Sequence, residues 1–140
     1  MQKYAEMIKK SGLKATFQRM TILSVIDKFG HVSIDEIYEE VKKTHPTLSL
    51  ATVYKNILNM VSHNVLMEVP IAGQKSRYEL KKEDHIHLIC DICGLVVDLD
   101  PDTVIQKTLK KIAQRESFLL SSAQVNIYGV CPNCAFKKVS

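Results

Sequence analysis

Four strong metal ligands fall within the segment HIHLICDICG: His85, His87, Cys90 and Cys93. A second cysteine pair with the same spacing, Cys131 and Cys134, follows near the end of the sequence. A structural zinc site takes four ligands that close its coordination shell, and two CxxC pairs supply four thiolates. Isolated buried cysteines would not explain the paired spacing. The pattern therefore predicts that the four cysteines bind one structural zinc ion.

With the cysteines assigned to zinc, the two histidines remain for other chemistry. Positions i and i+2 of a β-strand point to the same face, so His85 and His87 can share a second ion. A hairpin closed by the first CxxC pair would fold LVVDLD back along HIHLI and bring Asp98 near His87. Such nitrogen and oxygen ligands suit Fe(II), Mn(II) or zinc, and they allow the exchange that a sensor requires. A solvated or hydrogen-bonded histidine pair is the alternative.

The charge of the chain is unevenly distributed. Residues 1–82 hold 13 Lys and Arg and 8 Asp and Glu, whereas residues 83–140 hold 6 and 7. The basic half is the candidate for a polyanionic partner, and all four cysteines lie in the other half. This division predicts two domains, 1–79 and 80–140, with a hinge near 79–84. The sequence has no apolar run of the roughly 18 residues that span a membrane and no signal-peptide pattern, so we expect a cytoplasmic protein with reduced cysteines.

The periodicity of the N-terminal half predicts helices followed by a β-hairpin, which together form a winged helix-turn-helix. Thr16, Ser33 and Ser49 are expected to cap helices, Ser33 in a capping box with Glu36. The predicted helices cover about 3–11, about 17–28, the segment after Ser33, and the segment from Ser49 to about His63. The runs VLMEVP and SRYEL are the predicted strands of the hairpin.

The helix that follows Ser49 is placed to enter a DNA major groove. Its exposed face is predicted to carry polar side chains that reach phosphates or base edges: Thr52, Lys55, Asn56 and Asn59. Its buried face is predicted to carry Val53, Ile57, Leu58 and Val61. The alternative is an ordinary solvated helix face in a small bundle, but the basic charge of this half favours DNA.

The second half mixes strands with a helix. HIHLIC and LVVDLD are predicted to be extended, and PDTVIQKTLKKIAQRES is predicted to be a helix with Pro101 at its start. One face of that helix carries Val104, Ile105, Leu109 and Ile112. FLLSSAQVNIYGVC is predicted to be a long strand or a hairpin edge.

Several separated motifs, in order, resemble the ferric-uptake-regulator family of bacterial metal-dependent repressors: GLKATFQRMTIL, HVSIDEIY, LSLATVYKNI, HIHLICDICG and IYGVCPNC. The resemblance runs from end to end. It implies an α+β fold, in which an N-terminal winged helix-turn-helix is followed by a small α/β dimerisation domain with a four-cysteine zinc site. It also implies a homodimer that binds double-stranded operator DNA.

The resemblance further implies a regulatory Fe(II) or Mn(II) site near the hinge, with ligands from both domains: His31, Glu79, His85, His87 and Asp98. Its metal-bound form would fit a palindromic operator and repress transcription. Lys55 and the hydroxyls of Thr52 and Tyr54 are expected to face that operator. By resemblance, Arg19 and Ser49 should do so as well.

Local features favour the peroxide-sensing branch of this family over the iron-responsive branch. Asp98 follows CGLVV, where iron-uptake members usually carry Glu, and SSAQVNIYG has no histidine for a further metal site. In that branch, Fe(II) reduces hydrogen peroxide and the oxidant attacks a ligand, here His31 or His85. Glu79 departs from the Asp typical of peroxide sensors, so an iron-responsive repressor is the alternative. Lys55 matches neither branch and leaves the choice of operator open.

Two other classes of protein compete with this interpretation. Zinc hydrolases and deaminases keep an open position on zinc and a nearby carboxylate base. A four-cysteine site is closed and no HxE motif accompanies it, so we do not expect an enzyme or a small-molecule substrate other than peroxide. A zinc-ribbon interaction module is the second competitor, but it would not need His31.

Overall fold

The computed structural model describes residues 1–82 and 85–139, apart from the side chains of residues 138 and 139. The chain divides into two compact units, an N-terminal unit over Met1–Lys81 and a C-terminal unit that begins at Lys82. Residues 83 and 84 of the predicted hinge lie outside the described residues. In the part of the chain that is described, no helix is both long and apolar enough to cross a membrane.

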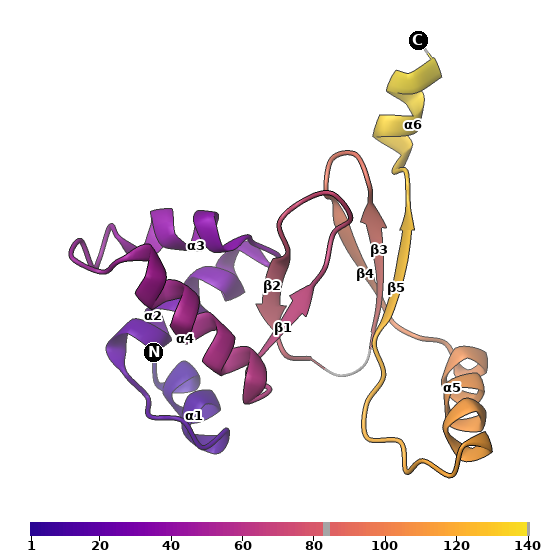
Figure 1. Ribbon diagram of the computed structural model, residues 1–140, viewed down its shortest axis with the longest axis horizontal. Helices are drawn as coiled ribbons and strands as arrows, with labels where there is room; N and C mark the ends of the chain where they lie inside the picture. Colours follow the sequence, from indigo (N-terminus) through magenta and orange to yellow (C-terminus); the bar gives the residue numbers. More distant parts are fainter. Residues whose placement is uncertain (83–84, 140) are drawn as a thin grey trace. The chain divides into compact units, whose positions relative to one another are not determined.

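The N-terminal unit consists of four helices and a two-stranded hairpin (Figure 1). Its elements are α1 (Gln2–Lys10), α2 (Phe17–Phe29), α3 (Ile34–Val41), α4 (Leu50–Ser62), β1 (Leu66–Val69) and β2 (Arg77–Leu80). The predicted caps are confirmed: Thr16 accepts from the amide of Arg19, Ser49 accepts from the amide of Thr52, and Ser33 forms the capping box with Glu36. The unit is therefore the predicted winged helix-turn-helix, in which α4 is the helix predicted to be the recognition helix.

The core of the N-terminal unit fixes the orientation of α4. Val53, Ile57 and Met60 of α4 are fully buried among apolar side chains of the other helices. Burying each such side chain contributes about 1.5–3 kcal/mol. Leu58 was predicted to be buried, but it is 40% exposed. It lies one turn after Tyr54, which is 49% exposed, so both belong to the outer face of the helix.

The β1–β2 hairpin, which is the wing of the winged helix, is extended by a third segment. β1 and β2 pair antiparallel, as predicted, with Met67 opposite Glu79. An isolated bridge joins Val32, in the loop between α2 and α3, to Tyr78 of β2. Two backbone hydrogen bonds of 2.7 and 3.2 Å close this bridge, so the α2–α3 loop is fixed to the wing.

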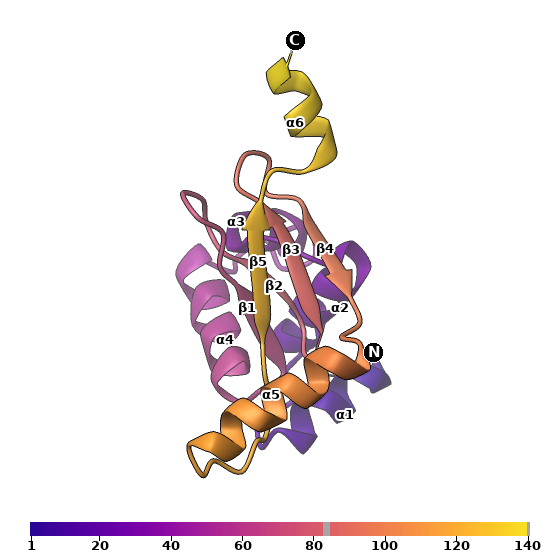
Figure 2. The same ribbon diagram turned by 90° about the vertical axis from the view of Figure 1, so that its right-hand side faces the viewer.

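The C-terminal unit is built on a three-stranded sheet with the order β4-β3-β5 (Figure 2). β3 (Ile86–Cys90) pairs antiparallel with β4 (Val96–Leu99) and parallel with β5 (Val125–Gly129). A parallel pair needs a crossover connection, and α5 (Thr103–Arg115) lies in that connection. The hairpin predicted around the first CxxC pair is confirmed, because His87 is the register partner of Asp98.

Three predictions for this unit need correction. α5 starts at Thr103, and Asp102 caps it by accepting from the amide of Ile105, so Pro101 lies before the helix. Only Val125–Gly129 of the predicted long strand is extended. The segment after Cys131 forms a helix, α6 (Pro132–Val139), which was not predicted.

α5 is amphipathic, but none of its residues is buried. Val104 is 71% exposed and Ile112 is 48% exposed. The predicted apolar face therefore exists, but within the described part of the chain it has no core to cover.

Candidate metal centres and nucleic-acid interface

The four cysteines form one cluster in the C-terminal unit. Their sulfur atoms lie within 4.8 Å of one another, and the Sγ atoms of Cys93 and Cys131 are 3.7 Å apart. Zn–S bonds of about 2.3 Å in a tetrahedron would separate the sulfurs by about 3.8 Å. All four cysteines are free thiols. The cluster thus has the ligand type, number and spacing that a closed zinc site requires.

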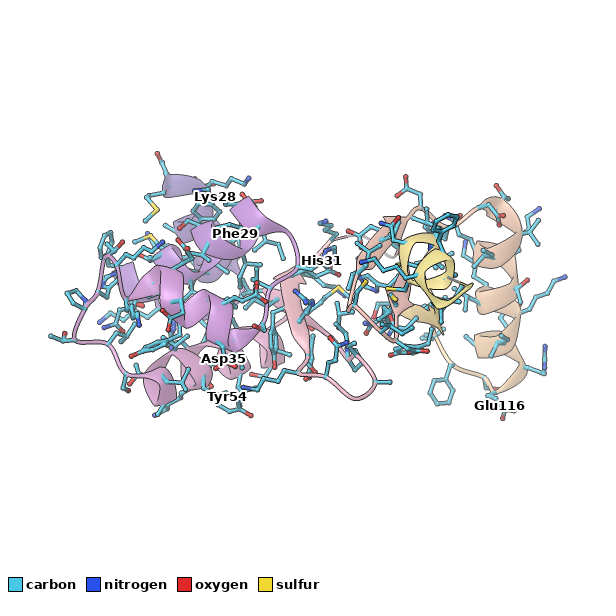
Figure 3. The ribbon with its side chains drawn as sticks, turned by 90° about the horizontal axis from the view of Figure 1, so that it is seen from above. Lys28, Phe29, His31, Asp35, Tyr54 and Glu116 are labelled. Atoms are coloured by element: carbon cyan, nitrogen blue, oxygen red, sulfur yellow. The ribbon has the colours of Figure 1, made fainter. Side chains whose placement is uncertain are left out.

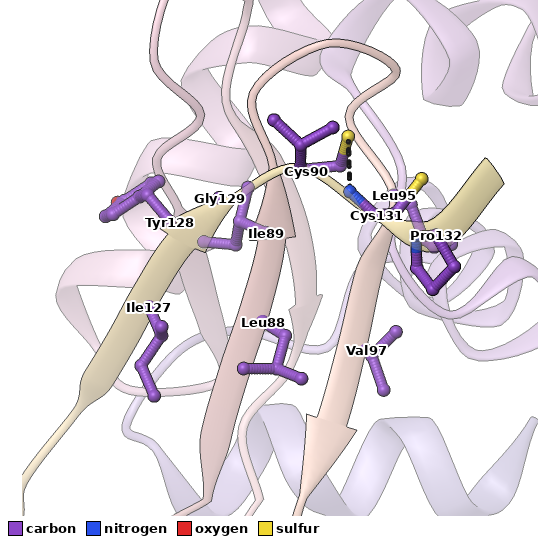
Figure 4. Close-up of a pocket in the computed structure, with 11 residues that line it drawn as sticks. Leu88, Ile89, Cys90, Leu95, Val97, Ile127, Tyr128, Gly129, Cys131 and Pro132 are labelled. Atoms are coloured by element: carbon purple, nitrogen blue, oxygen red, sulfur yellow. Dashed lines mark hydrogen bonds between the residues drawn. The ribbon is translucent and has the colours of Figure 1, made fainter. Parts of the chain in front are cut away.

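Backbone amides of this cluster favour the thiolate form of Cys90, which is the form that binds a cation. The amides of Cys131, Cys93 and Ile92 point at Sγ of Cys90 from 3.4–3.5 Å, and they lower the pKa of Cys90 to about 6 against the effect of burial. Figure 4 shows the contact from Cys131 as a dashed line. A hydrogen bond with Cys131 and burial together raise the pKa of Cys134 to about 12. The thiolate form of Cys90 is therefore favoured, whereas that of Cys134 is disfavoured by the sulfurs crowded around it. A bound cation would stabilise the thiolate form of both.

A second group of donors lies in the same unit, at the beginning of β3 and on β4. Nε2 of His85 and Nε2 of His87 lie 3.6 and 3.5 Å from Oδ1 of Asp98. The two imidazole centroids are 4.3 Å apart. Ligands at about 2.0–2.2 Å from one ion are separated by roughly 3.0–3.5 Å, so each imidazole lies close to the distance from Asp98 that two ligands of one ion would have. The predicted approach of Asp98 to His87 is confirmed, and His85 lies equally close to Asp98.

His31 and Glu79 form a separate pair in the N-terminal unit. The bridge between Val32 and Tyr78 places His31 opposite Glu79, because both lie one residue beyond it. Nε2 of His31 lies 2.6 Å from Oε2 of Glu79, whose side chain is fully buried. His31 itself lies just beyond Lys28 and Phe29 at the end of α2 (Figure 3). A buried carboxylate is costly without a cationic or hydrogen-bonding partner, so this pair is a strong candidate for holding a cation.

The predicted DNA-contacting residues lie at one end of the recognition helix. Ser49 caps α4, and its hydroxyl lies 2.9 Å from that of Thr52. Tyr54 and Lys55 are exposed on the following turn. Figure 3 shows Tyr54 on the side of the unit away from Lys28. The polar outer face predicted for α4 is present, while its contacts with DNA stay a prediction.

Arg19 connects α2 to this face. Its Nε donates to Oδ1 of Asn56 over 3.1 Å, and its Nη1 donates to the carbonyl of Lys14 over 2.8 Å. Both contacts orient the guanidinium beside α4. The turn before α4 is held by His45, whose Nε2 lies 3.1 Å from the hydroxyl of Thr21.

Asn126 on β5 is a polar residue that was not among the predicted site residues. It is the register partner of His87 across the parallel strands, and its Oδ1 lies 3.0 Å from Nδ1 of His87. The signal was the alternation of polar and apolar residues in VNIYG, but using it requires knowing that β5 pairs with β3.

The other face of the same sheet is apolar. Ile127, Leu88 and Val97 form a row across the three strands by register, and they lie side by side in Figure 4. They are 49%, 37% and 38% exposed. Together with residues next to both cysteine pairs, they line a pocket of about 220 Å³. The sheet therefore has a polar row, Asn126–His87–Asp98, on one face and an uncovered apolar row on the other.

Comparison with known proteins shows what this architecture is similar to. Residues 10–128 match the family described as the ferric uptake regulator family. The chain is 36% identical to a ferric uptake regulation protein of Bordetella parapertussis, over 91% of this chain and 93% of the relative. It is 31% identical to the peroxide operon regulator of Bacillus subtilis, over 95% of this chain and 92% of the relative.

Solved structures give the same result. The Campylobacter jejuni peroxide stress regulator is 35% identical, with a TM-score of 0.77, over 92% of this chain and 97% of that one. The Pseudomonas aeruginosa ferric uptake regulator, solved with manganese, is 26% identical, with a TM-score of 0.77, over 92% of this chain and 98% of that one. The fold, the three groups of candidate ligands and the match over most of the length lead to one conclusion: the chain belongs to the ferric uptake regulator family.

Proposed function

We propose that this protein is a metal-dependent transcriptional repressor that binds operator DNA and senses peroxide. The observation that carries the proposal is that each of the two units holds its own group of nitrogen and oxygen donors. His31 and Glu79 belong to the winged-helix unit. His85, His87 and Asp98 belong to the sheet unit. Under the proposal, all five serve a single regulatory ion.

A shared ion gives the switch a physical form. An ion that needs ligands from both units is bound best in one arrangement of those units. Binding therefore selects that arrangement, by as much as the affinity differs between the two states. In the proposed mechanism, residues 1–79 contact DNA, residues 80–140 dimerise, and the segment near 79–84 is the hinge between them.

The proposed partner of the sheet unit is a second copy of the chain. The apolar row of the sheet and the apolar face of α5 are uncovered in the described part of a single chain, as noted above. Large uncovered apolar surfaces of this kind are typical of obligate interfaces. A dimer with two-fold symmetry presents two recognition helices, which explains a palindromic operator.

The ligand chemistry supports a different metal for each site. The four thiolates favour zinc held permanently for structure, because the coordination shell is closed. The imidazoles and carboxylates favour an exchangeable Fe(II) or Mn(II) ion, and the Pseudomonas relative was solved with manganese. The proposal includes a cytoplasmic location and no enzymatic turnover, since a repressor reacts once with its signal.

The peroxide signal is the finer part of the proposal. Asp98 in the regulatory set favours it, and two of the relatives described above are named as peroxide regulators. Bound Fe(II) would start the reduction of peroxide beside the imidazoles, and the oxidation of one imidazole would complete it. His31 or His85 would take up the oxygen, and an oxidised imidazole is a poorer ligand. An iron-responsive repressor without peroxide sensing is the second candidate, favoured by Glu79 and by the Bordetella relative.

An operator-binding titration with Fe(II) and with Mn(II), each with and without peroxide, tests the proposal. We expect both metals to promote binding, and peroxide to abolish it only in the Fe(II) form. Mass spectrometry of digested protein should find one added oxygen on a peptide containing His31 or His85. Oxygen on Cys90 or Cys93 with intact histidines would overturn the chemistry. Fe(II)-dependent binding without any oxidation would assign the protein to the iron-responsive candidate.

The variant His87→Ala separates the two metal sites in the same titration. It should abolish metal-activated DNA binding while leaving the zinc content and the dimer intact. Equal loss of zinc would show that the histidine supports the cysteine cluster instead.

A further inference from the structure

We propose that Asn126 is a positioning residue that fixes the tautomer and the orientation of the His87 imidazole, so that Nε2 faces the regulatory ion. The inference rests on the proposed function, because it assigns a role toward the ion of that same site. It concerns a residue that contacts no metal in the proposed scheme.

The first step is the register of the sheet. His87 on β3 is opposite Asn126 on β5 and opposite Asp98 on β4. Side chains at register positions of neighbouring strands share a face. The imidazole is therefore held between an amide on one side and a carboxylate on the other, in one row across three strands.

The second step is the hydrogen bond. Nδ1 of His87 lies 3.0 Å from Oδ1 of Asn126. The same oxygen accepts from Nε2 of Gln124 over 3.4 Å, which is consistent with its assignment as the carbonyl oxygen of the amide. A carbonyl oxygen only accepts, so Nδ1 of His87 must carry the proton in this contact. A neutral imidazole then has its lone pair on Nε2.

The third step is the direction of that lone pair. Nε2 of His87 is turned toward Asp98, 3.5 Å from Oδ1. It therefore lies among the other proposed ligand atoms, while Nδ1 is engaged on the far side of the ring. The His87 side chain is fully buried, so water does not compete for Nδ1. A buried histidine whose second nitrogen is fixed in this way is ready to coordinate without first changing its tautomer.

The amide also has a consequence for affinity. A carboxylate partner would increase the basicity of the coordinating imidazole, whereas a neutral amide orients the ring with less effect on its charge. Asn126 thus fixes the geometry of the imidazole without strengthening its bond to the ion. The ion can therefore still leave, which suits a sensor.

The experiment uses the zinc-loaded full-length dimer without regulatory metal, labelled with ¹⁵N-histidine, at a pH where the imidazoles are neutral. Two-bond proton–nitrogen correlations report which nitrogen carries the proton. We expect the Nδ1–H form for His87 in the wild-type protein and a shift toward the Nε2–H form in Asn126→Leu. Asn126→Asp retains the acceptor and should retain the Nδ1–H form. His85 is the internal control and should be unchanged. A wild-type His87 with its proton on Nε2, or the same tautomer in Asn126→Leu, would overturn the proposal.

A Mn(II) titration of the same proteins supplies the second readout. Loss of a partner that supports a ligand typically weakens metal binding about 10–100-fold, so Asn126→Leu should show a loss of that size. Asn126→Asp should bind at least as tightly as the wild type. The conservative neighbour variant Ile127→Val, on the opposite face of β5, controls for disturbance of the strand and should bind normally.

The two readouts separate the two proposals. A wild-type protein that binds no Mn(II) outside the cysteine cluster would contradict the proposed function, even if the tautomer of His87 is as expected. A wild-type protein that binds Mn(II), together with an Asn126→Leu variant that binds it equally well, would contradict the positioning role alone.

Discussion

His31 and Glu79 face each other across the end of an isolated β-bridge, with Nε2 of His31 2.6 Å from Oε2 of Glu79. The residues are far apart in sequence, and the backbone hydrogen bonds between Val32 and Tyr78 bring them together. The winged-helix unit therefore holds a buried carboxylate of β2 against an imidazole of the α2–α3 loop, and the bridge fixes that loop to the strand. This rigidity makes the pair suitable for reporting an ion.

Glu79→Gln removes the charge of this carboxylate while keeping its shape. If Glu79 is a ligand, the affinity for Mn(II) should fall by more than about 10-fold. Removing a residue that only supports a ligand already weakens metal binding by about that factor. Calorimetry of zinc-loaded protein measures this. Zinc content should not change, because the cysteines belong to the other unit. Unchanged Mn(II) affinity would remove Glu79 from the site. Glu79→Asp, compared with the wild type for oxidation by peroxide, tests whether the length of this side chain controls peroxide sensitivity.

Removing one cysteine should disable the zinc site. Cys93→Ser or Cys134→Ser leaves three thiolates, and structural zinc in small modules contributes about 10–16 kcal/mol to folding. We expect loss of zinc by elemental analysis and loss of the dimer by size-exclusion chromatography. Ser122→Ala, at an exposed position of the same unit, is the control. A stable dimer that contains no zinc would contradict the structural role.

Much of the fold follows from local sequence signals. The caps at Thr16, Ser33 and Ser49 fix where three helices begin, because each side chain satisfies an amide that the helix leaves unpaired. The approach of Asp98 to His87 was also predictable, since a hairpin around the CxxC pair permits few registers. These features depend on residues close together in sequence.

Features that depend on distant pairing were not predictable in this way. Asn126 meets His87 only because β5 joins β3 in parallel after a crossover, and no local pattern encodes that pairing. The apolar face of α5 was predicted, but what covers it was not, and none of its residues is buried in a single chain, because periodicity does not say what covers a face. Leu58 was wrongly placed in the core for a similar reason, since apolar character alone does not fix which side of α4 is inside.

The proposed dimer can be tested on the apolar row of the sheet. Leu88→Glu would bury a charge in the interface, and an uncompensated buried charge costs roughly 3–5 kcal/mol, so the dissociation constant of the dimer should rise by at least about 100-fold. Analytical ultracentrifugation measures the change. Leu88→Met keeps the apolar character and should remain a dimer. Retained zinc would show that the charged variant is folded, and a fully dimeric, zinc-loaded Leu88→Glu protein would exclude this face as the interface.

The last prediction concerns the recognition helix. Lys55 is exposed on α4, one residue after Tyr54, and the resemblance left its role in operator choice open. If its ammonium group contacts a phosphate, Lys55→Ala should weaken operator binding and reduce the slope of log K against log salt by about one, because one fewer counterion is released. If it instead contacts a base edge, the loss should be about 1–3 kcal/mol and should depend on the operator sequence. Fluorescence anisotropy across a salt series, with the metal-loaded dimer and two operators that differ in one base pair, distinguishes these results. Lys28→Ala removes the same charge from the other side of the unit (Figure 3) and should leave the slope nearly unchanged. If Lys55→Ala and Lys28→Ala bind both operators like the wild type at every salt concentration, the DNA-binding face does not include this turn of α4.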